Sequence, residues 1–210
     1  MIQIKGATLK ARLDFARARG GEALIERLKT QPDPVGDLAR QRVFSLREFP
    51  LREVESLCAV ILKELRGDDE MHREMGVYSA DEHRALQKIV HGQKTDPHAL
   101  LEGMCRQFPQ YLVGEIGEAV YEKTEQGGRI VWSGHRETGR NHCLSSIGYT
   151  TRLLENHGIT GSRGRDAECL LRGGSRCVWE FNWKTVTGEV RSTSTIKASA
   201  LQEAIKRQSS

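Results

Sequence analysis

The sequence predicts an α+β fold in which helices pack on an antiparallel sheet and the N-terminal portion is helical. In the first half of the chain, apolar residues recur three and four positions apart, which is the spacing of one helix face. After Pro109, runs rich in β-branched and aromatic residues are separated by glycines, which is typical of hairpins. From Cys177 to Trp183, large apolar residues alternate with polar or smaller ones, so one face of a strand lies against a core.

The length fits one compact domain, because a chain of 210 residues can bury a substantial core by itself. We expect residues 1–110 to form the helical portion and residues 111–188 to form an α/β portion of the same domain. Residues 189–210 are polar and predict a tail that ends in a helix from Ser199 to Arg207.

Four helical regions are expected in the N-terminal portion. The first runs from Ala7 to Lys29, and Gly20-Gly21 divides it into two short helices. The second follows Pro50 and ends at Gly67, and the third spans roughly residues 79–90. In the fourth, Asp96 caps a helix that starts at Pro97 and runs through Cys105. Cys58 and Cys105 fit these helices as small buried hydrophobes.

The C-terminal portion predicts two hairpins with a helix between them. Residues 119–124 and 129–132 read as strands joined across residues 126–128. A helix from Asn141 to Asn156 follows, closed by His157-Gly158. The last hairpin joins a strand over residues 166–171 to the aromatic strand that starts at Cys177, through a turn that contains two glycines.

Charge and hydropathy narrow the classes of partner. The 32 basic and 28 acidic side chains are interspersed, and the absence of a basic stripe argues against nucleic acid as the partner. No run approaches the roughly 20 apolar residues that cross a bilayer, and residues 1–6 lack the features of a secretory signal. We therefore expect a cytoplasmic protein without membrane contact, whose five cysteines are thiols or metal ligands rather than disulfides.

Three cysteines of the C-terminal portion form the most chemically informative pattern. Cys169 and Cys177 bracket the turn of the last hairpin, and Cys143 lies on the preceding helix. Three thiolates and one carboxylate can complete a tetrahedral metal site, and Asp166 is the natural fourth ligand. Asp166 and Cys169 would face opposite sides of a regular strand, so a shared ion requires a bulge or a strand that starts later. Three unrelated core cysteines, or a Cys169–Cys177 disulfide, explain the same spacing.

Two motifs carry a resemblance to a known family. They read Cys143-Leu-Ser-Ser-Ile-Gly148-Tyr149 and Asp166-x2-Cys169-x3-Gly173-x3-Cys177. Together they resemble the C-terminal motif of 4-vinyl reductase domains, including the sensor domains of aromatic-responsive bacterial transcription activators. The resemblance covers about residues 140–185 and implies that Cys143, Asp166, Cys169 and Cys177 bind zinc, although the family carries Glu where Asp166 stands.

The resemblance also has implications for the rest of the chain. It implies the architecture of 4-vinyl reductase domains and of vesicle-tethering (TRAPP) subunits. The region from Met1 to Gly76 is loosely similar to the start of haem-nitric-oxide sensor domains and to an uncharacterised myxobacterial paralogous family. The haem motif Tyr-x-Ser-x-Arg does not occur in the sequence, and haem is therefore not expected.

These observations predict a zinc-containing module of bacterial signalling that senses a small molecule or binds a protein and is not an enzyme. We expect a homodimer without an output domain of its own, which takes a small apolar or aromatic ligand and acts on an unidentified protein partner. Tyr121, Trp132 and Tyr149 are the candidate ligand-binding residues, although core packing explains each of them equally well. His135 is expected to be a solvated surface residue.

Two other classes of function stay open. One is an enzyme, either reductase-like or a zinc hydrolase, for which His142 beside Cys143 is the suggestive neighbour. The other is a structural component of an assembly. We do not expect the protein to bind or process nucleotides, because Gly161 and Gly164 do not form a dinucleotide fingerprint and no P-loop occurs.

Overall fold

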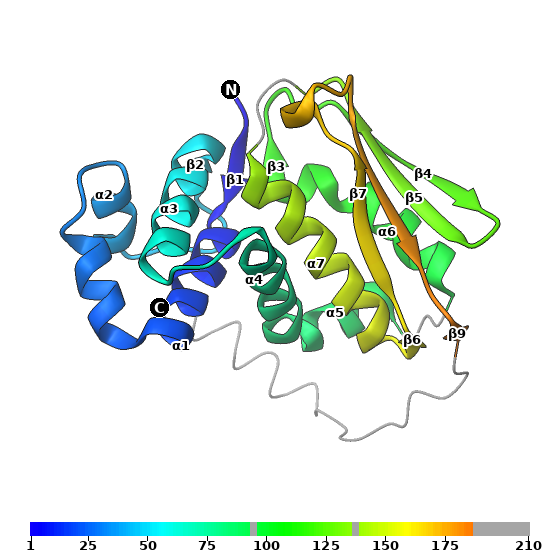
Figure 1. Cartoon of the computed structure of the whole chain (residues 1–210), viewed down its shortest axis with the longest axis horizontal. Coiled ribbons are helices and arrows are strands. Elements are labelled where there is room, and N and C mark those ends of the chain that lie inside the picture. Colours follow the sequence, from blue (N-terminus) through cyan, green and yellow to red (C-terminus); the bar gives the residue numbers. More distant parts are fainter. Residues whose placement is uncertain (93–95, 136–138, 187–210) are drawn as a thin grey trace.

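The computed structural model describes residues 1–92, 96–135 and 139–186, and their fold is the predicted α+β class. Helices of the N-terminal portion occupy one side of the molecule, and a four-stranded antiparallel sheet occupies the other (Figure 1). One cluster of buried apolar residues extends through both, from Ile2 to Phe181. Within the described residues, no helix is both long enough and apolar enough to span a bilayer.

The N-terminal portion contains short strands as well as helices. Its elements are β1 (Gln3–Lys5), α1 (Gly6–Lys29), α2 (Val35–Arg40), β2 (Glu48–Pro50) and α3 (Leu51–Glu64). β1 lies between β2 and β3 (Leu112–Val113) in a small antiparallel sheet that the sequence did not predict. Strands of two or three residues are too short to show an alternating pattern. The predicted break in the first helix is confirmed, because Gly21 has a φ of 66° inside α1.

The middle of the chain forms α4 (Asp69–Glu82), α5 (Arg84–His91) and α6 (Pro97–Tyr111). The helical region predicted over roughly residues 79–90 is confirmed as helical, but it comprises the end of α4 and most of α5, which meet at His83. The predicted cap of α6 is confirmed, since the carboxylate of Asp96 accepts a hydrogen bond from the backbone N–H of His98.

The larger sheet has the strand order β4-β5-β8-β7, with every neighbouring pair antiparallel. Its strands are β4 (Glu118–Thr124), β5 (Gly127–Ser133), β7 (Arg163–Glu168) and β8 (Cys177–Asn182). A short 3-10 helix, η1 (Leu170–Arg172), replaces the end of the strand that was predicted to reach Leu171. β6 (Ile159–Thr160) pairs with β9 (Thr185–Val186) as a separate small sheet.

The helix α7 (Arg140–Asn156) joins the two sides of the molecule and matches the predicted helix closely. It packs against β7 and β8 on one side and against α4 on the other. The contact with α4 is unusually close at two glycines. A Cβ atom at Gly76 would lie 1.9 Å from the carbonyl oxygen of Ser145, and one at Gly148 would lie 2.1 Å from the carbonyl oxygen of Arg73. Glycine at both positions therefore sets the distance between the helices.

The polar tail of residues 189–210 and its helix from Ser199 to Arg207 lie outside the described residues. The division at residues 110 and 188 stays a prediction.

Candidate functional site

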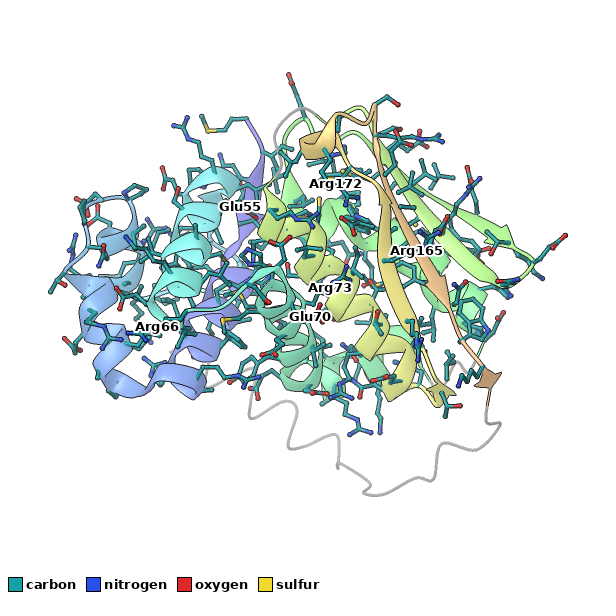
Figure 2. The ribbon with its side chains drawn as sticks, viewed as in Figure 1. Glu55, Arg66, Glu70, Arg73, Arg165 and Arg172 are labelled. Carbon is teal, nitrogen blue, oxygen red and sulfur yellow. The ribbon has the colours of Figure 1, made fainter. Side chains whose placement is uncertain are left out.

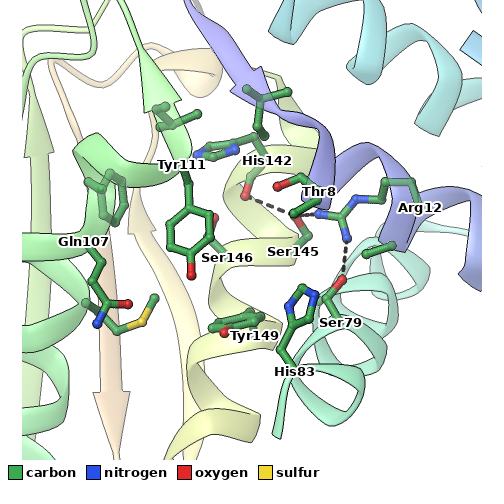
Figure 3. Close-up of a pocket in the computed structure, with 17 residues that line it drawn as sticks. Thr8, Arg12, Ser79, His83, Gln107, Tyr111, His142, Ser145, Ser146 and Tyr149 are labelled. Carbon is green, nitrogen blue, oxygen red and sulfur yellow. Dashed lines mark hydrogen bonds between the residues drawn. The ribbon is translucent and has the colours of Figure 1, made fainter. Parts of the chain in front are cut away.

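A cavity of about 120 Å³ lies where the start of α1, α4, α6 and α7 meet. Figure 3 shows that polar side chains from α1, α4 and α7 converge on one side of it. Apolar side chains form the rest of the wall, among them Ile4, Met104, Phe108 and Leu112. The cavity therefore combines an apolar surface with a few fixed polar groups, which is the usual composition of a small-molecule site.

Arg12 is the charged residue of this cavity, and its side chain extends from α1 toward α4 and α7 (Figure 3). It is only 5% exposed. Its guanidinium donates hydrogen bonds to the Ser145 hydroxyl at 2.7 Å and to the Ser79 hydroxyl at 3.1 Å. It also donates to the backbone oxygen of Met75 at 3.2 Å. These contacts hold the guanidinium in one orientation at the edge of the cavity.

His142 lines the same cavity from the first turn of α7. Its ring lies near Trp132 and Trp179, with ring centroids 5.2 and 6.5 Å away. Burial, together with the charge of Arg12, lowers the pKa of His142 to about 3, so the imidazole is neutral at physiological pH. Its Nε2 atom is buried and makes no hydrogen bond with the described residues. An orphaned polar atom of this kind in a cavity is available to a ligand.

Glu55 positions the start of α7 from α3 (Figure 2). Its carboxylate accepts hydrogen bonds from the backbone N–H groups of Asn141, at 3.1 Å, and His142, at 2.8 Å. It thus satisfies donors at the first turn of α7, where the N-cap residue Gly139 has no side chain. Burial raises the pKa of Glu55 to about 7 despite these two hydrogen bonds.

The structure brings Cys143, Cys169 and Cys177 together in a second cluster. Their sulfur atoms lie within 4.8 Å of one another, all three residues are buried, and no disulfide joins the cysteines of the described chain. The sulfur atoms of Cys143 and Cys177 are 3.8 Å apart. The Nε2 atom of His135 lies 3.5 Å from the sulfur atom of Cys177. Hydrogen bonding from Cys143, reinforced by His135, lowers the pKa of Cys177 to about 4 against the effect of burial.

Asp166 does not lie with the three sulfur atoms. β7 does contain an irregularity between Asp166 and Glu168, as a shared ion would require. The Asp166 carboxylate instead pairs with Arg140 at 2.6 Å, Arg172 at 3.1 Å and Arg73 at 3.6 Å. Figure 2 labels Arg73, on α4, and Arg172, on η1. Burial alone would raise the pKa of Asp166, but the hydrogen bond from Arg140 and the charges of Arg140 and Arg172 hold it below its ordinary value.

The predicted ligand-binding residues occupy three different environments. Tyr149 lines the cavity, whereas Trp132 and Tyr121 do not. Trp132 is fully buried and donates from its indole N–H to the backbone oxygen of Ile116 at 2.6 Å. Tyr121 pairs its hydroxyl with the ring of His98. The expectation of a solvated His135 is wrong, because this residue is 4% exposed and stacks on Trp132 with ring centroids 3.6 Å apart.

Sequence reasoning missed Arg12 although a signal was present. Leu9, Arg12 and Ala16 follow one another at helical spacing, so Arg12 falls on the buried face of the first helix. A charge on an apolar helix face needs a partner, and such a position is a candidate site on physical grounds alone.

Comparison with known proteins shows the fold. No family model matches the sequence, and no curated protein matches it. An H-NOX protein from S. oneidensis in the Fe(II) state superimposes with a TM-score of 0.70 at 13% identity, covering 88% of this chain and 98% of that one. An unliganded Fe(II) H-NOX protein from K. algicida gives 0.63 at 15% identity, covering 87% of this chain and 97% of that one.

The chain has the fold of H-NOX domains. The looser likeness expected for the N-terminal region, to haem-nitric-oxide sensor domains, is therefore confirmed as a likeness of fold. The resemblance to 4-vinyl reductase domains receives no support from these comparisons and stays a prediction. The prediction of zinc as the cofactor is wrong, because the solved structures of this fold are described with Fe(II), and one is described by its haem and porphyrin.

The cavity does not fit haem. An engineered protein cavity of about 150 Å³ holds a single benzene ring. The present cavity, at about 120 Å³, is smaller than that, whereas a porphyrin contains four five-membered rings. Tyr149 and Phe108 are among the side chains that limit its size. The residues present thus suit a ligand of one ring or a short chain.

Proposed function

We propose that the protein is a non-enzymatic module that senses a small molecule bound in the cavity between α1, α4, α6 and α7. The observation that carries this proposal is the cavity itself, with its apolar wall and converging polar groups. The solved structures of similar fold include Fe(II)NO and Fe(II)CO states, so this architecture accommodates small ligands in other chains. A cavity of about 120 Å³ limits the ligand to about one ring or a short acyl chain.

The hydroxyls at the cavity support binding rather than catalysis. Ser79 donates to the backbone oxygen of Met75 at 2.9 Å, and Ser145 donates to that of His142 at 3.3 Å. Both hydroxyls also accept hydrogen bonds from Arg12. A serine nucleophile needs its proton directed at a base, whereas these two protons are directed at the backbone.

The position of the cavity suits a sensor that passes a signal to a protein partner. Its wall combines α1 and α4 of the N-terminal portion with α6 and α7, which pack on the sheet. A ligand that fills the cavity changes the free energy of one packing arrangement relative to another, and this difference is what a partner can detect. Homodimerisation and a cytoplasmic location remain predictions, which sedimentation and cell fractionation would check.

The test is a binding screen of the full chain against phenol, benzoate, benzamide and hexanoate by isothermal titration calorimetry. A Ser146→Leu variant places a larger side chain into the cavity, and Ser56→Leu on the exposed face of α3 is the matched control. We expect at least one ligand to bind the wild-type chain and the Ser56→Leu variant, and to bind Ser146→Leu at least tenfold more weakly. Absence of binding by all four, or equal binding by the two variants, would overturn the proposal.

A further inference from the structure

We infer that the cavity takes a small carboxylate, with Arg12 as its anchor. This inference rests on the proposed function and specifies the chemical class of the ligand. It predicts an anionic head on the guanidinium of Arg12 and an apolar body of one ring or a short acyl chain against α6.

The first step is the charge of Arg12. A guanidinium stays protonated in proteins, so this residue brings a permanent positive charge to a position that is 5% exposed. Its hydrogen-bond partners are neutral: two hydroxyls, one backbone oxygen and the thiol of Cys58. Within the described part of the chain, Arg12 forms no ion pair with a carboxylate, and its Nε atom makes no hydrogen bond. Buried charges are normally paired with an opposite charge, and no carboxylate of the described residues forms a direct ion pair with this one.

The second step is the charge of the surroundings. Arg12 is the only permanently charged residue among the described residues that line the cavity. The two histidines of the lining, His83 and His142, cannot supply a counter-charge, because an imidazole is either neutral or positively charged. Glu55 is the acid whose field reaches Arg12, but it is held by two backbone N–H groups of α7 and does not line the cavity. The electrostatic potential in the cavity therefore favours an anion.

The third step is preorganisation. Ser79 and Ser145 each direct a lone pair at Arg12 because their protons are committed to backbone oxygens. The guanidinium is thus fixed before any ligand arrives, which lowers the entropy lost on binding. A planar guanidinium matches the two oxygens of a carboxylate better than a single neutral acceptor.

The fourth step is the shape of the remaining wall. Met104, Phe108 and Leu112 offer an apolar surface, so the part of the ligand beyond its head is hydrophobic. The neutral Nε2 atom of His142 offers one further hydrogen-bonding position. Benzoate has the size and polarity that this cavity accommodates.

The experiment compares benzoate with benzamide on the full chain at pH 7.5, because the two ligands share a shape and differ in charge. We expect benzoate to bind at least about tenfold more tightly, since a carboxylate forms a charge-assisted pair with the guanidinium, whereas the neutral amide offers it only an uncharged acceptor. In an Arg12→Met variant the affinity for benzoate should fall more than the affinity for benzamide, so that the ratio of the two affinities approaches one. An Arg12→Lys variant should retain part of the preference for benzoate, because lysine keeps the positive charge but lacks the planar pair of donors that a guanidinium offers to a carboxylate.

The outcomes separate this inference from the proposed function. If benzamide or phenol binds the wild-type chain as tightly as benzoate, and Ser146→Leu abolishes that binding, the ligand class is wrong and the sensing cavity stands. If no ligand binds, both fall. Should Arg12→Met not fold, the ratio of the two affinities on the wild-type chain and on Arg12→Lys decides the question, and a ratio near one in both would overturn the inference.

Discussion

At the scale of single residues, Glu55 predicts a pH dependence of stability with an unusual sign. Its pKa is about 7 in the folded chain, whereas an unfolded glutamate titrates near about 4.3. Between these values the folded state holds more protons than the unfolded state, so the free energy of unfolding falls as pH rises through this window. For a group that is partly solvent-accessible we expect a contribution of roughly 1–3 kcal/mol.

The measurement is urea unfolding of the wild-type chain and a Glu55→Gln variant at pH 5 and pH 8, followed by tryptophan fluorescence. Relative to the variant, the wild type should lose stability on going to pH 8. The lowered pKa of His142 acts in the opposite direction, because a buried neutral histidine loses stability as pH falls, but it is present in both proteins and cancels in the difference. Parallel pH profiles would contradict the prediction.

The cysteine cluster and the partners of Asp166 differ in how far the sequence could predict them. The spacing of Cys143, Cys169 and Cys177 left unrelated core cysteines open, and the resemblance of their motifs to a known family implied one shared site. Their sulfur atoms lie within 4.8 Å of one another. The partner of Asp166 could not be predicted, because three arginines from separate elements reach it only after α4, α7 and η1 have packed. A side chain's partner depends on tertiary contacts that local sequence does not encode.

At the scale of elements, the contact between α4 and α7 predicts the effect of a small substitution. Replacing a glycine in a helix interior by alanine normally stabilises a protein by about 0.5–1 kcal/mol. At Gly76 the sign should reverse, because the added Cβ atom would lie 1.9 Å from a backbone oxygen of α7 and the helices would have to separate. We expect Gly76→Ala to destabilise the fold by roughly 1–3 kcal/mol and to weaken ligand binding, since Gly76 lines the cavity.

Gly20→Ala is the matched control. Its added Cβ atom would meet side-chain atoms of Leu24, Cδ2 at 2.5 Å and Cβ at 2.7 Å, and no backbone of a second helix, so the loss of unfolding free energy should be smaller than at Gly76. Thermal unfolding followed by circular dichroism measures both variants. Equal effects at Gly76 and Gly20 would show that the two helices do not depend on this close approach.

Elements with a long periodic pattern were predictable, and short ones were not. α7 and β8 carry patterns of many residues, and both lie where the sequence placed them. The first part of α4 was not predicted, because its apolar residues are few and charged residues occupy much of its surface. Its buried residues are His72, Met75, Gly76, Ser79 and Ala80, and the role of Gly76 becomes visible only against α7.

At the scale of the whole molecule, the cavity connects segments that are far apart in the sequence, from Ile4 to Tyr149. The zinc site expected from the C-terminal motif lies at the cysteine cluster and not at the cavity. A local motif therefore did not identify the cavity, which is built from distant segments. A ligand in the cavity must stabilise α1, α4, α6 and α7 together, because opening any one of them exposes it. Bound ligand at one hundred times its Kd should therefore raise the free energy of unfolding by about 2.7 kcal/mol. Hydrogen exchange should slow in all four helices at once, whereas protection confined to α6 and α7 would mean that the N-terminal portion is not part of the site.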